Sequence, residues 1–139
     1  MSIQMVLLPV FVQVLLTFIL LFWMGRHRYV AVKAKQVKIV NEAASEYVWP
    51  PMAAQASRSF HSQFETPLLF FALVALAILT KKDDALFVVM EWLWVVSRVV
   101  HALIHTTVNR VSLRFPAFFV GVVILFAMWI IFAVRILAA

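Results

Sequence analysis

The chain has 139 residues, of which 65% are hydrophobic and only 13% are charged. Its mean hydropathy of +1.02 leaves too little polar surface to cover a soluble domain of this size, so we expect it to lie in a lipid bilayer. The absence of cysteine excludes disulfides and thiolate metal sites. The formal net charge is +6, but the basic residues flank apolar segments and form no single patch, which favours membrane headgroups over nucleic acid.

The sequence predicts four membrane-spanning helices, at about residues 5–26, 52–80, 85–108 and 115–138. The first has no basic region before it and no cleavage site after it, so we expect a retained helix and not a signal peptide. The second is apolar without interruption only from Pro67 to Thr80, and it reaches a spanning length only if its helix begins near Met52. The predicted fold is a single-domain, all-α antiparallel bundle of four transmembrane helices.

Basic residues are concentrated on one side of this predicted bundle. The first and third connections, with the helix ends beside them, carry Arg26, Arg28, Lys33, Lys35, Lys38, Arg58, Arg110 and Arg114, and the other side has Lys81, Lys82 and Arg135. The positive-inside rule therefore places these two connections in the cytoplasm and both termini outside. The long connection, about residues 27–51, mixes charges and is predicted to be a mobile lid or a surface helix.

Two of the predicted spans carry polar side chains at helical spacing. The rows are Arg58, His61, Ser62 and Glu65 in the second span and Arg98, His101 and His105 in the third. Offsets of three, four and seven residues place each row on one face of a helix. At about 1.5 Å per residue, both rows lie in the same layer of the cytoplasmic leaflet, together with Arg26, Arg28 and Arg114. Charges at this depth are costly, so the rows predict a functional site.

The charge balance of this layer indicates the kind of ligand. Glu65 is the only acid among several arginines, so it would pair with an arginine or receive an ammonium group. The excess of cations suits an anionic ligand that also carries one amine. Glutathione, with two carboxylates, one ammonium group and a thiol, has this charge pattern.

Several other interpretations of these residues stay open. Arg58 would snorkel to the headgroups if it had no ligand, and Glu65 with Arg98 would form a structural ion pair between helices. His61, His101 and His105 would supply three imidazoles for a metal ion, although no carboxylate motif accompanies them. Glu91 would pair with Lys82 or Arg98. A small drug/proton exporter would need a carboxylate in the first span, which has only Gln13.

These motifs resemble those of the MAPEG family, the membrane-associated proteins of eicosanoid and glutathione metabolism. The resemblance is carried by Arg58-x3-Ser62-x2-Glu65 before Pro67, and by Arg98-x2-His101-x3-His105 with Arg114 beyond it. The phrases 61–65, 97–110 and 114–118 are similar to the bacterial branch, which implies a bacterial inner membrane. The resemblance covers nearly the whole chain and implies a homotrimer that binds glutathione between subunits near the cytoplasmic face.

The resemblance also implies roles for the residues that would hold glutathione. Arg58 matches an arginine that holds a glutathione carboxylate, and Glu65 matches the glutamate that takes the ammonium group. Ser62 stands where the family usually has asparagine. The expected glutathione-binding set is Arg26, Arg58, His61, Ser62, Glu65, Arg98 and His101.

For catalysis, Arg114 matches the arginine that stabilises the glutathione thiolate. His105 is the second catalytic candidate, although eicosanoid members have tyrosine at its position. The implied function is a glutathione-dependent transferase or peroxidase acting on lipophilic electrophiles or lipid hydroperoxides from the bilayer. The alternative is a non-catalytic member of the same fold that binds a lipid or a partner.

Overall fold

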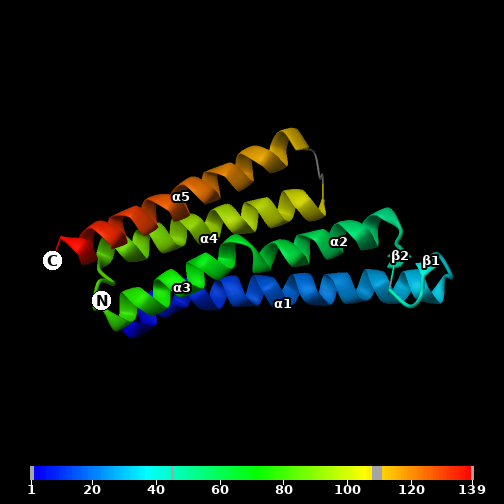
Figure 1. Cartoon of the computed structure of the whole chain (residues 1–139), viewed down its shortest axis with the longest axis horizontal. Coiled ribbons are helices and arrows are strands. Elements are labelled where there is room, and N and C mark those ends of the chain that lie inside the picture. The colour runs from blue at the N-terminus through cyan, green and yellow to red at the C-terminus, as the bar shows by residue number, and fades with distance from the viewer. Residues whose placement is uncertain (1, 45, 108–110, 139) are drawn as a thin grey trace.

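The computed structural model describes residues 2–44, 46–107 and 111–138. Its elements are α1 (Ile3–Lys33), β1 (Lys38–Asn41), β2 (Glu46–Val48), α2 (Pro51–His61), the 3-10 turn η1 (Ser62–Phe64), α3 (Thr66–Leu79), α4 (Ala85–Thr106) and α5 (Val111–Leu137). Figure 1 shows an elongated antiparallel bundle with both chain ends at the same end of the molecule. Within the described residues, four segments are long and apolar enough to cross a membrane, with α2, η1 and α3 together forming the second. The predicted four-helix membrane fold is confirmed.

Local signals in the sequence set where these helices begin. The hydroxyl of Ser2 accepts a hydrogen bond from the backbone N–H of Met5 and caps α1. The carboxylate of Asp84 caps α4 by accepting from the N–H of Phe87 at 3.1 Å. Proline stands in the first turn of α2 and of α3, where its missing N–H leaves no helical hydrogen bond unmade.

The first helix is longer than the sequence predicted. It continues to Lys33 instead of ending near residue 26, and its 31 residues span about 46 Å. This exceeds the roughly 30 Å of a bilayer's hydrocarbon, so α1 is longer than an upright span needs. The third predicted span corresponds to α4, which ends at Thr106, and Thr107 is already a turn residue. Residue 108, where the predicted span ends, and Arg110 beyond it lie outside the described residues.

The second span is broken, whereas the sequence predicted one continuous helix. α2 ends at His61, three residues form η1, and Glu65 adopts a non-helical backbone conformation (φ −94°, ψ −99°) before α3 begins at Thr66. Pro67 explains the break, because a continuous helix would drive its ring against the carbonyl of residue 63. The break is visible in Figure 1 between the ribbons of α2 and α3.

The long first connection contains a two-stranded antiparallel sheet, so the predicted surface helix is wrong, and the mobile lid stays a prediction. Lys38 pairs with Val48 and Ile39 with Tyr47. β-branched and aromatic side chains favour this extended pairing over a helix. Figure 1 places the hairpin at the end of α1 that lies far from the chain termini.

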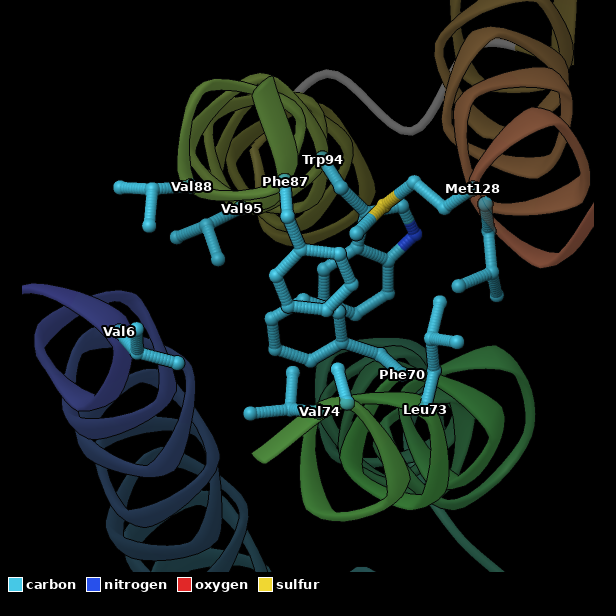
Figure 2. Close-up of a cluster of buried hydrophobic side chains, with 11 residues drawn as sticks. Val6, Phe70, Leu73, Val74, Phe87, Val88, Trp94, Val95 and Met128 are labelled. Atoms are coloured by element: carbon cyan, nitrogen blue, oxygen red, sulfur yellow. The ribbon is translucent and has the colours of Figure 1, made fainter. Parts of the chain in front are cut away.

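All four spans contribute to the apolar core shown in Figure 2. Phe70 of α3 stacks on Trp94 of α4 with ring centroids 4.2 Å apart, while Val6 of α1 and Met128 of α5 close the cluster. Within lipid, this packing and not water exclusion holds helices together. The core fills the half of the bundle nearest the termini and leaves the other half for polar side chains.

Candidate functional site

A cavity of about 390 Å³ collects polar side chains from three segments of the bundle. Its lining contains Arg58, His61, Ser62, Glu65, His101, His105, Arg114, Phe115 and Phe118. Seven of the nine site residues predicted from the sequence therefore line one cavity. The broken second span supplies one wall, and α4 and α5 supply the others.

The break in the second span decides how its residues face the cavity. Arg58 and His61 lie in the last turn of α2, Ser62 begins η1, and Glu65 is the bend before α3. His61 donates from Nδ1 to the carbonyl of Ser57 at 2.7 Å, which fixes its ring. Irregular backbone at membrane depth is tolerated where it lines a cavity, as it does here.

Two histidines of α4 form the buried side of the cavity. The rings of His101 and His105 lie 5.6 Å apart and are 4% and 6% exposed as residues. Within the described parts of the chain, Nδ1 of His101 and both ring nitrogens of His105 have no hydrogen-bond partner. Buried polar atoms without partners are costly, so these nitrogens are available to a ligand.

Arg98 lies behind the cavity wall and not in it. It is only 2% exposed, and its Nη2 donates to the carbonyl and hydroxyl oxygens of Ser62 at 3.3 and 3.0 Å. Glu65 forms no ion pair with Arg98 within the described residues. The alternative of a structural ion pair between Glu65 and Arg98 is therefore not seen among the described residues. Arg98 instead joins α4 to η1.

Ser62 lines the cavity, but its hydroxyl is fully used within the protein. It donates to the carbonyl of Ser59 at 2.9 Å and accepts from Arg98 and from Nε2 of Gln63 at 3.1 Å. A hydroxyl has one donor and two lone pairs, so all three are occupied. The hydrogen bonds of Ser62 therefore hold η1 against the end of α2 and against α4.

Arg26 is not brought to this cavity. It lies on the surface of α1, beside a separate cavity that Trp23, His27 and Val30 also line. Arg28, predicted at the same depth, donates to the hydroxyl of Ser57 at 2.9 Å and stacks over Trp49. Arg28 therefore ties α1 to the start of α2.

The structure also bears on two alternatives raised by the sequence, an ion pair of Glu91 and a metal site made of three histidines. Glu91 is fully buried, and its carboxylate has no hydrogen-bond partner in residues 2–44, 46–107 and 111–138. The expected pairing with Lys82 or Arg98 is therefore wrong. Across those same ranges, no three His, Asp or Glu side chains come together as metal ligands, so the geometry does not favour the three-histidine alternative.

The sequence analysis assigned no role at the site to three buried glutamines, Gln13, Gln55 and Gln63. Nε2 of Gln13 donates to Oε1 of Gln63 at 2.8 Å, and Gln55 donates to the backbone carbonyl of His105. Glutamines carry no charge, so a search for ionisable rows passes over them. The available signal was an amide in the middle of an apolar span, as at Gln13.

An apolar cavity of about 390 Å³ lies between α3 and α5, lined by Thr66, Leu69, Val122, Leu125, Phe126 and Trp129. Thr66 directly follows Glu65, and Val122 lies one helical turn from Phe118. The apolar cavity therefore begins next to the polar one on both of its walls.

A model of the MAPEG family matches residues 6–134, which is nearly the whole chain. This match confirms the resemblance seen in the sequence motifs. Neither the curated proteins nor the solved structures compared with the chain include a match.

Proposed function

Because the chain belongs to the MAPEG family, we propose that it is a glutathione-dependent transferase or peroxidase embedded in the membrane. Its acceptors would be lipophilic electrophiles or lipid hydroperoxides that arrive from the bilayer. The observation that carries this proposal is the cavity in which Arg58, Arg114 and Glu65 meet two buried histidines.

The donor set of the cavity fits glutathione. Apart from the histidines, the charged side chains of the lining are two arginines and one glutamate, which complement two carboxylates and one ammonium group. Arg58 would hold a carboxylate and Glu65 the ammonium group. The volume also lies in the range of about 300–1,000 Å³ that is usual for small-molecule sites.

Glutathione would supply a thiol whose pKa in water resembles that of free cysteine, about 8.5. Arg114 lies in the lining and would favour negative charge on the sulfur, which is the nucleophilic form. His105 has buried ring nitrogens without partners in the described chain, so it would hold or pass on the released proton. The neighbouring apolar cavity would hold the hydrocarbon part of the acceptor.

A second candidate function is non-catalytic binding of a lipid or a partner by the same cavity. Two observations favour it: the hydroxyl of Ser62 is fully used within the protein, and the only tyrosines, Tyr29 and Tyr47, lie outside the third span. Such a protein would bind a ligand in the cavity without transferring glutathione to an acceptor.

We further propose a homotrimer in a bacterial inner membrane, with the cavity near the cytoplasmic face and both termini outside. Support comes from the family, from the excess of basic residues at the hairpin end of the bundle and from the exposed apolar faces of α1 and α5. In this assembly, Arg26 of a neighbouring copy is the candidate to close the cavity.

The test measures thermal unfolding in detergent with and without millimolar glutathione. A ligand that binds only the folded state stabilises it, by about 2.7 kcal/mol at one hundred times its Kd. We expect glutathione to stabilise the wild type, to lose most of this effect in R58Q and R114Q, and to keep it in R135Q, whose arginine lies at the other end of the bundle.

An unchanged unfolding midpoint of the wild type with glutathione would contradict the proposal. Stabilisation with neither conjugation of an activated chloronitrobenzene nor reduction of a lipid hydroperoxide would favour the binding protein.

A further inference from the structure

A chain of buried side-chain hydrogen bonds runs from α1 through η1 to α4, just behind the cavity wall. Its members are Gln13, Gln63, Ser62 and Arg98, which are 0%, 2%, 7% and 2% exposed. Neither glutamine lines the cavity, and neither belongs to the charge pattern from which the function was proposed. The chain is the polar link between α1 and the broken turn.

Gln13 sits in a span that is otherwise almost wholly apolar. Its amide Nε2 donates to Oε1 of Gln63 at 2.8 Å. Inside a bilayer an amide without a partner costs several kcal/mol, because neither lipid nor water replaces the bond. Oε1 of Gln13 has no hydrogen-bond partner within the described residues, so the bond to Gln63 is what ties this amide to the turn, with Oε1 of Gln63 facing α1.

The other end of the Gln63 amide bonds to the broken turn. Its Nε2 donates to the carbonyl of Ser59 at 3.2 Å and to the hydroxyl of Ser62 at 3.1 Å. If the amide were reversed, Nε2 would face Nε2 of Gln13, and Oε1 would face the carbonyl oxygen of Ser59. The network thus fixes which end of the amide points to Ser62.

Ser62 then connects the glutamines to the arginine. Its hydrogen goes to the carbonyl of Ser59, so its two lone pairs are left for Gln63 and for Nη2 of Arg98. Ser62 also stands between His61 and Glu65, which both line the cavity. A change in the amide of Gln63 would therefore shift the wall at the residues assigned to the ligand.

We propose that Gln13 and Gln63 are positioning residues of the glutathione site, through which α1 holds the broken turn and Arg98 in the geometry that binds the ligand. This inference rests on the proposed function of the cavity. It predicts that glutathione affinity depends on two neutral side chains that do not touch the ligand.

The test compares Q13M, Q63M and the Q13M/Q63M double variant with T17V. Thr17 lies one turn from Gln13 in the same helix, and among the described residues its hydroxyl bonds only to the Gln13 carbonyl of its own helix, so T17V is a matched control. Binding is measured as the Kd for glutathione of the purified protein in detergent. Folding is followed by helicity and by the unfolding midpoint.

We expect Q13M and Q63M to weaken glutathione binding about tenfold and T17V to leave it within twofold. The double variant should unfold at a higher temperature than Q13M, because Q13M leaves Oε1 of Gln63 buried without a donor and the double variant removes that oxygen. Its Kd should nevertheless stay as weak as that of Q63M. In steady-state assays, the KM for glutathione should rise while kcat changes less than threefold.

The outcomes separate this inference from the proposed function. A wild type that does not bind glutathione would overturn both. If the wild type binds and the single variants melt early but keep the wild-type Kd, the glutamines serve packing alone and only the inference is lost. Recovery of affinity in the double variant would also overturn it.

Discussion

Arg98 and Glu91 are two ionisable residues of α4 that the bundle buries almost completely, seven residues or about 10 Å apart. Arg98 bonds to the backbone and hydroxyl oxygens of Ser62, whereas the carboxylate of Glu91 has no hydrogen-bond partner within the described residues. Isolated buried charges are among the most expensive groups in a protein interior. Arg98 joins α4 to η1 behind the cavity wall, but nothing at the proposed site uses Glu91.

We predict that E91M stabilises the protein. The substitution keeps the length of the side chain and removes a carboxylate that has no partner in the described part of the bundle. The expected gain is roughly 1–3 kcal/mol in the free energy of unfolding, the usual cost of a buried unsatisfied polar group.

The measurement is the thermal unfolding midpoint in detergent, with E65M as the control. Glu65 is exposed at the cavity, so E65M should change the midpoint little while it lowers glutathione affinity. A lower midpoint for E91M would mean that the carboxylate has a stabilising partner in the membrane.

Among the helices, the start of α4 is held by Asp84, whose carboxylate makes both a helix cap and an ion pair. Asp84 caps the helix through Phe87 and forms an ion pair with Arg135 of α5 at 2.9 Å. The hydrogen bond from Arg135 lowers the pKa of Asp84 below its ordinary value, with the cap contributing in the same direction. This contact joins the ends of two spans next to the chain termini.

The lowered pKa predicts an acid-dependent loss of stability. Asp84 binds a proton more weakly in the folded than in the unfolded protein, so its contribution is complete above about pH 4 and is lost as the pH falls further. Both side chains are partly exposed, so the loss should stay below about 1 kcal/mol.

Unfolding midpoints at pH 6 and pH 3 check this for the wild type, D84N and D83N. Asparagine still caps the helix but cannot titrate, so D84N should lose less stability than the wild type on acidification. D83N should behave as the wild type does. Equal acid sensitivity of D84N and the wild type would contradict the assignment.

The helices were predictable wherever a long apolar run or a capping residue marked them. The break at η1 was not predicted, because hydropathy and helical spacing continue across Pro67 although its ring excludes a continuous helix. The hairpin was not predicted either, because its strands are three or four residues long and its connection carries mixed charges. Short elements depend on tertiary context more than on sequence periodicity.

At the scale of the whole molecule, the depth of polar residues was predictable and their direction was not. Counting residues from the turn at 81–84 brought seven of the predicted residues to one cavity. The rotation of each helix about its axis depends on packing, which places Arg98 behind Ser62 and Arg26 on the outer surface of α1. Spacing along a sequence does not fix that rotation.

The orientation in the membrane gives a prediction for the entire bundle. The natural chain contains no cysteine, so A43C in the hairpin and A138C at the opposite end provide single labels on exposed alanines. The positive-inside rule predicts that a membrane-impermeant maleimide labels A138C in intact cells and A43C only after permeabilisation. The reverse pattern would place the cavity on the other face.

The interruption in the second span also bears on how the nascent protein enters the bilayer. α3 has only 14 residues, about 21 Å of helix, so it cannot cross roughly 30 Å of hydrocarbon by itself. The carbonyl of Ser62 gains its bond from Arg98 only when α4 has been synthesised. We therefore expect the translocon to release these segments as a paired unit through the tight turn at residues 80–84, and not one at a time.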